Sequence, residues 1–414
     1  MNYPTVSKFF IGLLIVSYSA LSIAVQSNTA PNVIGDIVSF ESEVLGEERK
    51  LQVYVPANYQ TSDKNYPVLY VLDGQWNFMN AVAIQQTLKV PSNLPEMIIV
   101  GTVNQNPQRR RLFGEENKFK RYLLDEVLPY IDSNYRTSRE RLLFGWEMSA
   151  FFATNVFFNH SQLFDGAIIT NGGDSSDVEI QKFNDANKEQ TKYLFIANSD
   201  KDIYTVKYGK NLSRKLKQYA NKQLNWRYQK FNEEVHASVP YVAMYQGLKH
   251  YYFNYQSLVF ADLEAFNSLG GLDYLTRYFK TRGQRFNLPQ TIPDSTKNSL
   301  IWLAWNNNDF KHFTLFMKVF DSVLSSKRNT SMMWQNRFAR FYLKHGDLVN
   351  AQRYFEQAIH KYPNKAQLHE GLSLVFKAYG KREEARRHLM QAIELAVKTN
   401  DKKLANYQAA LSKL

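Results

Sequence analysis

The pattern of apolar and polar positions divides the chain into two parts. Across residues 25–257, short apolar runs typical of buried strands alternate with stretches of helical spacing. Strands that alternate with helices predict a mostly parallel sheet with helices on both faces. We therefore expect an α/β fold with a doubly wound sheet, whose buried strands lie at 66–72, 97–103, 142–144, 166–170 and 193–197.

The segments between these strands have their own patterns. Residues 33–43 and 50–55 alternate like strands, and Gly46 lies between them as a hairpin turn. Residues 118–133 have apolar positions at helical spacing. Residues 104–113, which contain Pro107 and three consecutive arginines, are predicted to be a loop.

From residue 258 onward, the pattern predicts helices only. Residues 258–294 are predicted to be a helical segment and a linker, and the linker stretch, residues 280–294, contains Gly283, Pro289 and Pro293. Residues 295–414 contain an internal repeat. Tyr342, Gly346, Ala351, Phe355 and Ala358 recur 34 residues later as small or apolar residues, at Phe376, Gly380, Ala385, Leu389 and Ala392. A repeat of 34 residues is typical of tetratricopeptide helical hairpins, so this region is predicted to be an all-α stack of such units.

Residues 1–24 resemble a signal peptide for export. Lys8 precedes the apolar run 9–15, and Ser22-Ile-Ala24 suits cleavage. The predicted location is outside the cytoplasm, either periplasmic or secreted, and no stable membrane span is expected after cleavage. An uncleaved membrane anchor is the alternative interpretation.

Composition narrows the chemistry. The chain has no cysteine, which excludes disulfides, thiol nucleophiles and cysteine-based metal sites. The net charge of +13 is compatible with an anionic partner, but the cations are spread along the chain and no nucleic-acid motif is present. A generally basic surface is the simpler explanation. The eight histidines show no metal-binding spacing, and no cofactor is predicted.

The stretch 141–158 carries the main chemical clue. A short apolar run ends at Gly145, small residues follow at Ser149 and Ala150, and a helical pattern begins. This is the layout of a nucleophile elbow, in which the sequence G-x-S-x-G holds a serine on a tight turn between a strand and a helix. Here the position of the serine is occupied by Glu147.

With these elements placed, the chain resembles the esterase family of α/β-hydrolases that includes S-formylglutathione hydrolases and ferric-siderophore trilactone esterases. The resemblance covers roughly residues 35–255. It rests on matching order and spacing of short segments, at 67–74, 95–101, 118–119, 127–132, 135–137, 163–167 and 236–240, together with the elbow.

The resemblance implies roles for individual residues. His236 matches the catalytic base, and the acid that orients it is expected at Asp200 or Asp202, between which the sequence does not decide. Backbone N–H groups near Gly74 and Met148 would form the oxyanion hole. Two further residues are candidates for substrate binding, Arg109 for an anionic group and Trp76 as a pocket wall, although a solvated loop and simple packing are the alternatives.

Glu147 changes what such a site can do. A carboxylate that attacked an ester would form an anhydride, so Glu147 cannot replace serine as the acyl acceptor. Beside His236 the anion is expected to favour the imidazolium form, which gives a Glu147–His236 ion pair and removes the general base. Ser149 lies two residues further along the helix, about 200° around its axis, and is not an obvious substitute.

Three hypotheses follow. The first is a catalytically impaired hydrolase fold that binds a ligand or acts as a scaffold. The second is an active carboxylic-ester hydrolase with an atypical site, in which Glu147 activates a water. The third is a protein-interaction module that acts through the C-terminal repeats while the front domain is an inert platform.

Overall fold

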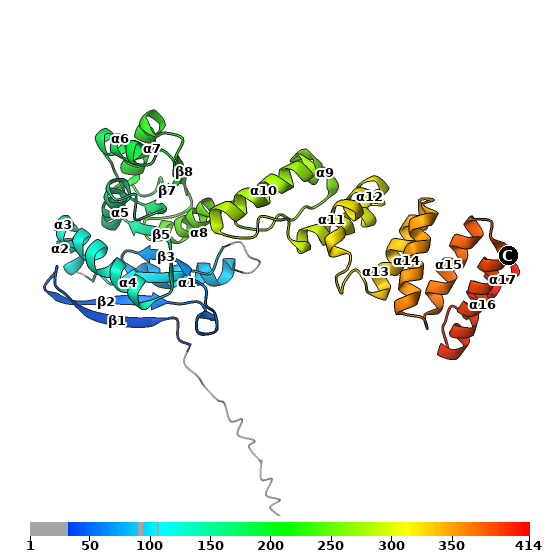
Figure 1. Cartoon of the computed structure of the whole chain (residues 1–414). Coiled ribbons are helices and arrows are strands. Elements are labelled where there is room, and N and C mark those ends of the chain that lie inside the picture. The colour runs from blue at the N-terminus through cyan, green and yellow to red at the C-terminus, as the bar shows by residue number, and fades with distance from the viewer. Residues whose placement is uncertain (1–31, 90–93, 106) are drawn as a thin grey trace, which may run out of the picture.

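The computed structural model describes residues 32–89, 94–105 and 107–414, so the predicted signal peptide at 1–24 lies outside the described residues. An α/β domain comes first, and an all-helical region extends away from it, as Figure 1 shows. The prediction of an α/β fold followed by an all-helical region is confirmed. Within the described part of the chain, none of the helices has both the length and the apolar character needed to cross a bilayer.

Within the described residues, eight strands form one mixed sheet in the order β1-β2-β4-β3-β5-β6-β7-β8. The first two strands form a hairpin, and β2 runs antiparallel to β4, whereas every pairing from β4 to β8 is parallel. The strands are β1 (Asp36–Ser42), β2 (Glu47–Tyr54), β3 (Tyr66–Val71), β4 (Ile98–Thr102), β5 (Thr137–Trp146), β6 (Gly166–Thr170), β7 (Lys192–Asn198) and β8 (Leu224–Lys230).

Helices cover both faces of this sheet because its central strands are apolar on both sides. On one face, α1 (Gly74–Leu88) and α8 (Val239–Tyr251) pack against alternate residues of β3, β5 and β7. On the other face lie the remaining helices of the domain, which bury the second core. They are α2 (Gln108–Gly114), α3 (Glu116–Arg121), the π-helical turn η2 (Tyr122–Val127), α4 (Leu128–Asn134), α5 (Met148–Asn159), α6 (Asp177–Ala186) and α7 (Val206–Tyr219), while the short turn η1 (Tyr59–Thr61) precedes β3.

The structure corrects two details of the predicted elements. The stretch 104–113 is not simply a loop, because α2 starts at Gln108 and holds the three arginines. The prediction of a linker from residue 280 was also too long, because α10 (Gly271–Phe286) continues through it. Gly283 is buried in that helix where a Cβ atom would lie 2.6 Å from the carbonyl oxygen of Leu288, so this glycine allows close packing and does not end the helix.

The helical region consists of antiparallel helices that pack side by side around their own apolar core. After α9 (Leu263–Ser268) and α10 come α11 (Asp294–Asn306), α12 (Phe310–Val319), the turn η3 (Asp321–Val323), α13 (Met332–Lys344), α14 (Leu348–Lys361), α15 (Ala366–Ala378), α16 (Arg382–Thr399) and α17 (Leu404–Ser412).

Two hairpins of this region have the same turn geometry 34 residues apart. Gly346 and Gly380 each follow the first helix of a hairpin, with φ of 79° and 77°. One residue later, the N–H of Asp347 donates to the carbonyl of Tyr342 at 3.0 Å, and that of Lys381 donates to Phe376 at 2.9 Å. Glycine is used here because other residues rarely adopt positive φ.

Candidate active site at the carboxyl ends of the strands

Glu147 lies on a sharp turn between β5 and α5, at the carboxyl end of the central strand. Its backbone has φ 55° and ψ −115°, a strained conformation for a residue that is not glycine. A hydrogen bond of 3.0 Å from its N–H to the carbonyl of Thr170 holds the turn against β6. A Cβ atom at Gly145 would lie 2.4 Å from the carbonyl oxygen of Ser149, so glycine is required before the turn. The backbone therefore has the geometry of an elbow that presents residue 147.

Ser149 is fully buried and does not face a ligand. Its hydroxyl donates to the carbonyl of Trp146 at 2.8 Å and accepts the N–H of the same residue at 2.9 Å. These bonds tie the serine to the turn itself. The hydroxyl is consequently part of the structure of the elbow and is not presented to a substrate.

The structure places His236 against one of the two candidate acids. The imidazole Nδ1 lies 2.7 Å from a carboxylate oxygen of Asp202, whose side chain is fully buried. Burial alone would raise the pKa of Asp202, but hydrogen bonds from Thr205 and His236 outweigh it and lower that pKa. Asp200 instead forms an ion pair of 2.6 Å with Lys230, and both side chains are exposed.

Two further side chains hold the backbone of His236. The amide of Asn171 donates to the His236 carbonyl at 2.8 Å, and the indole N–H of Trp146 reaches the same oxygen at 3.3 Å. Asn171 is fully buried directly after β6 and has φ 53°, a conformation that asparagine tolerates better than most residues. Sequence analysis missed Asn171, because nothing in its neighbourhood distinguishes it from an ordinary turn residue.

The carboxylate of Glu147 has a different partner from the one predicted. It accepts a bond of 2.8 Å from Arg109, and no ion pair joins it to His236 among the described residues. The second terminal nitrogen of Arg109 donates to Asp73 at 3.0 Å. The expected Glu147–His236 ion pair was therefore wrong, because a buried guanidinium from α2 lies closer to the elbow and neutralises the carboxylate.

This arrangement also changes the position predicted for Arg109. Its side chain is only 7% exposed, so it lies inside the domain and not on a solvated rim. Both terminal nitrogens already donate to carboxylates. Burial raises the pKa of Asp73, and the hydrogen bond and charge of Arg109 oppose that rise. An anionic ligand would have to compete with two carboxylates of the protein for this guanidinium.

Aromatic rings line the approach to these charges. Trp76 is 46% exposed and meets Trp146 edge to face, with ring centroids 5.5 Å apart. The ring of Trp146 in turn lies 5.1 Å from that of His236. The guanidinium of Arg109 stacks on these indoles, 5.3 Å from Trp76 and 5.6 Å from Trp146. The half-exposed ring of Trp76 thus lies between solvent and the buried guanidinium of Arg109.

Gly74 and Met148 are the first residues of α1 and α5, which follow the neighbouring strands β3 and β5. N–H groups in the first turn of a helix have no acceptor within the helix, and the structure places both predicted oxyanion-hole residues at helix starts. A Cβ atom at Gly74 would lie 2.8 Å from the Cα of Gly101, which explains the glycine there. Within the described residues, no group of three or more histidine, aspartate or glutamate side chains is placed to hold a metal ion.

Comparisons with known proteins agree with this geometry. Residues 42–243 match the family model described as "Putative esterase". The chain is 28% identical over 202 residues to the uncharacterized protein YjcH of Bacillus subtilis, a match that covers 45% of this chain and 83% of that protein. It is 25% identical over 184 residues to an endo-1,4-beta-xylanase/feruloyl esterase of Xylanibacter ruminicola, covering 40% of this chain and 24% of that protein.

A solved structure is similar over both parts of the molecule. It is an uncharacterised protein from Capnocytophaga ochracea, with a TM-score of 0.55 and 14% identity. The similarity covers 90% of this chain and 99% of that one, and at this identity it concerns the fold alone. Taken with the elbow and the sheet order, the family match identifies the first part of this chain as an esterase-like α/β-hydrolase domain.

Proposed function

We propose that the hydrolase domain is a ligand-binding domain that has lost acyl-transfer catalysis. The observation that carries the proposal is the ion pair between Glu147 and Arg109. A serine at this position would give its proton to His236 and attack a carbonyl carbon. The carboxylate has no proton to give, and its partner is a buried cation rather than the imidazole.

The groups that would recognise a ligand support binding as the remaining role. The backbone N–H groups of Gly74 and Met148 can donate hydrogen bonds to the carbonyl oxygen of an ester or of the acid derived from it. Trp76 and Trp146 offer an aromatic wall beside them. The proposed ligand is therefore a small-molecule ester or a carbonyl compound of similar shape, held without formation of an acyl-enzyme. Nothing in this proposal requires a cofactor.

A second candidate function is slow hydrolysis without a covalent intermediate. The observation that favours it is the contact of 2.7 Å between His236 and Asp202, which is the arrangement of a general base and its orienting acid. In this reaction Nε2 of His236 takes a proton from a water molecule, and the water oxygen attacks the ester carbonyl. The N–H groups of the two helices stabilise the oxyanion, and the alcohol leaves with the proton from the imidazolium.

The remaining proposals concern location and assembly. We infer that residues 1–24 direct export to the periplasm or beyond the cell. We also propose that the helical hairpins from residue 295 onward are tetratricopeptide-like repeats that bind a protein partner. The shared turn geometry at Gly346 and Gly380 supports the repeat assignment.

Ester assays on three variants test the proposed function. Wild type should hydrolyse short-chain p-nitrophenyl esters poorly. Glu147→Ser should raise the rate, because the base, the acid and the elbow are already in place. Slow wild-type hydrolysis that His236→Ala abolishes would favour the second candidate, and wild-type hydrolysis at ordinary enzyme rates would contradict the proposed loss of catalysis. No gain in Glu147→Ser would show that the site has changed in more than one residue.

A further inference from the structure

Two histidines face each other across the hairpin that α15 and α16 form. His369 lies in the first turn of α15, and His388 lies in the second turn of α16. The two Nδ1 atoms are 3.4 Å apart, and the centroids of the two imidazole rings are 5.7 Å apart. The contact between these side chains therefore joins the two helices of the hairpin.

The hydrogen bonds of His369 determine where the protons lie when both rings are neutral. Its Nε2 is 3.1 Å from the carbonyl oxygen of Pro363, which can only accept, so this nitrogen carries the hydrogen. Nδ1 of His369 is then an acceptor, and Nδ1 of His388 donates to it. A single proton between the two Nδ1 atoms thus completes the neutral pair.

The surroundings of the pair disfavour a positive charge. His369 is only 8% exposed, and the ring of Phe376 stacks on that of His388 with centroids 5.4 Å apart. Burial, together with His369 of α15 and Arg387 of α16, lowers the pKa of His388 to about 4. The carboxylate of Glu356, which faces the imidazole from α14, opposes this shift without cancelling it.

Protonation is incompatible with the contact in its present form. A proton on Nδ1 of His369 would direct two N–H groups at each other, and a proton on Nε2 of His388 would place an imidazolium between the helices. Glu370, the next residue of α15, forms a salt bridge with Arg340 of α13, so its charge is already paired. The packing of α15 against α16 is consequently that of the neutral histidine pair.

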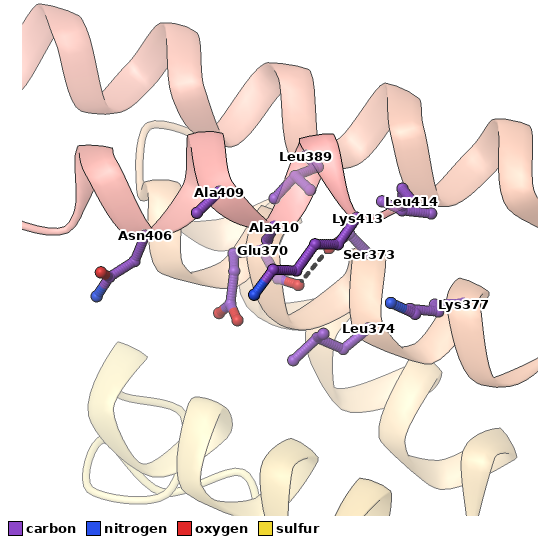
Figure 2. Close-up of a pocket in the computed structure, with 10 residues that line it drawn as sticks. All are labelled: Glu370, Ser373, Leu374, Lys377, Leu389, Asn406, Ala409, Ala410, Lys413 and Leu414. Atoms are coloured by element: carbon purple, nitrogen blue, oxygen red, sulfur yellow. Dashed lines mark hydrogen bonds between the residues drawn. The ribbon is translucent and has the colours of Figure 1, made fainter.

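A cavity of about 330 Å³ is bounded by the same two helices together with α17. Figure 2 shows Glu370 and Leu389 in its lining, and each of them directly follows one of the two histidines in the sequence. A change in the separation of α15 and α16 would therefore change the shape of this cavity as well.

We propose that the His369–His388 pair is an acid-sensitive switch that loosens the hairpin of α15 and α16. Above the ordinary histidine pKa of 6.5, both rings are neutral and the packed hairpin is fully stable. As pH falls below 6.5, the separated helices bind a proton that the packed pair excludes, so acid favours separation. The loss of stability is complete near pH 4, where the packed pair is protonated too. This inference is independent of the function proposed for the hydrolase domain.

Hydrogen exchange of the full chain, followed by mass spectrometry on peptides of α15 and α16, tests the switch. Wild type and His388→Asn are compared at about pH 7.5 and at about pH 5. The asparagine amide offers a donor near the position of Nδ1 but does not titrate. The control His360→Asn makes the same substitution at an exposed position of α14. Each ratio of exchange rates is taken at one pH, so the intrinsic pH dependence of amide exchange cancels.

We expect the ratio of wild-type to His388→Asn exchange rates to rise about tenfold between the higher and the lower pH. Linkage gives roughly 30-fold at pH 5 for a pKa that changes from 6.5 to about 4, and the partial exposure of His388 reduces this factor. Peptides of β3 and β5 should show no such rise. A ratio that does not depend on pH, or an equal rise for His360→Asn, would overturn the proposal.

An NMR titration of wild type tests the switch even if His388→Asn does not fold. Long-range ¹H–¹⁵N spectra distinguish the two nitrogens of each imidazole, and contacts with the ring of Phe376 identify His388. Its ring should stay neutral down to about pH 5, with the proton on Nδ1. A protonation midpoint of His388 near 6.5 would contradict the proposal directly.

Discussion

Arg109 provides the sharpest test of the charges around the elbow. Its buried guanidinium joins Asp73, which is fully buried, to Glu147, which is 34% exposed. Arg109→Met keeps a long apolar side chain between the aromatic rings but leaves Asp73 without its cation. Removal of one partner from a buried ion pair typically costs about 3–5 kcal/mol. We expect the hydrolase domain to lose stability in this range at neutral pH.

Two further variants separate the contribution of Glu147 from that of the unpaired charge on Asp73. Glu147→Gln removes the exposed carboxylate and should cost only about 0–1 kcal/mol, because water replaces much of the lost interaction. The double variant Asp73→Asn/Arg109→Met should be more stable than Arg109→Met alone, since it no longer buries an unpaired charge. The order of stability is thus wild type, Glu147→Gln, the double variant and Arg109→Met.

The deficit of Arg109→Met should also depend on pH. Burial already raises the pKa of Asp73 above its ordinary value of 3.8, and loss of the cation that opposes this shift raises the pKa further. An acid whose pKa is raised in the folded state destabilises the fold above that pKa and stops doing so once it is protonated. The deficit should therefore shrink as pH falls through the folded-state pKa of Asp73 towards 3.8.

Native-state hydrogen exchange measures the loss of stability in Arg109→Met for the hydrolase domain alone. Amides in β3 and β5 lie in the core of the sheet and report the unfolding free energy of the hydrolase domain, separately from the helical region. A loss of less than about 1 kcal/mol in Arg109→Met, or an equal loss in Glu147→Gln, would refute the claim that a buried guanidinium holds these charges together.

Three further predictions follow from the same structure. Hydrogen bonds lower the pKa of Asp202 in the folded state, so this carboxylate stabilises the fold above its ordinary pKa of 3.8 and stops doing so on acidification. Asp202→Asn should therefore lower the free energy of unfolding by about 1–3 kcal/mol at neutral pH, and by progressively less below about pH 4, as measured by urea titration. Asn171→Gly keeps the positive φ but removes the amide that bonds to His236. It should lower the free energy of unfolding by about 1 kcal/mol and broaden the imidazole NMR signals of His236. Gly380→Ala meets no atom within 4 Å yet should lower the stability of the helical region by about 1 kcal/mol because of its φ of 77°, whereas Gly114→Ala in α2 should be neutral or stabilising.

Local pattern was sufficient to predict the architecture. Apolar runs located the buried strands of the sheet, because a strand that is buried on both faces is apolar at nearly every position. The elbow was equally visible, because Gly145 and the position of Glu147 lie within a few residues of each other. The α2 helix was missed, as Pro107 and the consecutive arginines at 109–111 suggested a solvated loop.

Long-range contacts within the site were beyond such reasoning. The sequence offered Asp200 and Asp202 as equivalent neighbours, and only the tertiary structure shows which of them faces His236. The partner of Glu147 comes from a helix 38 residues away in sequence, so the predicted ion pair with the imidazole was wrong. The choice of partner for a charge depends on which other charges folding brings near it, and no local spacing records that.

The central claim is that this hydrolase fold does not form an acyl-enzyme. The most direct measurement is mass spectrometry of acid-protease digests of wild type and Glu147→Ser, each quenched in acid during incubation with p-nitrophenyl acetate. We predict that wild type carries no acetyl group on the elbow peptide that contains Glu147 and Ser149, and that Glu147→Ser acquires one. An acetyl group on that peptide of the wild-type protein would contradict the claim.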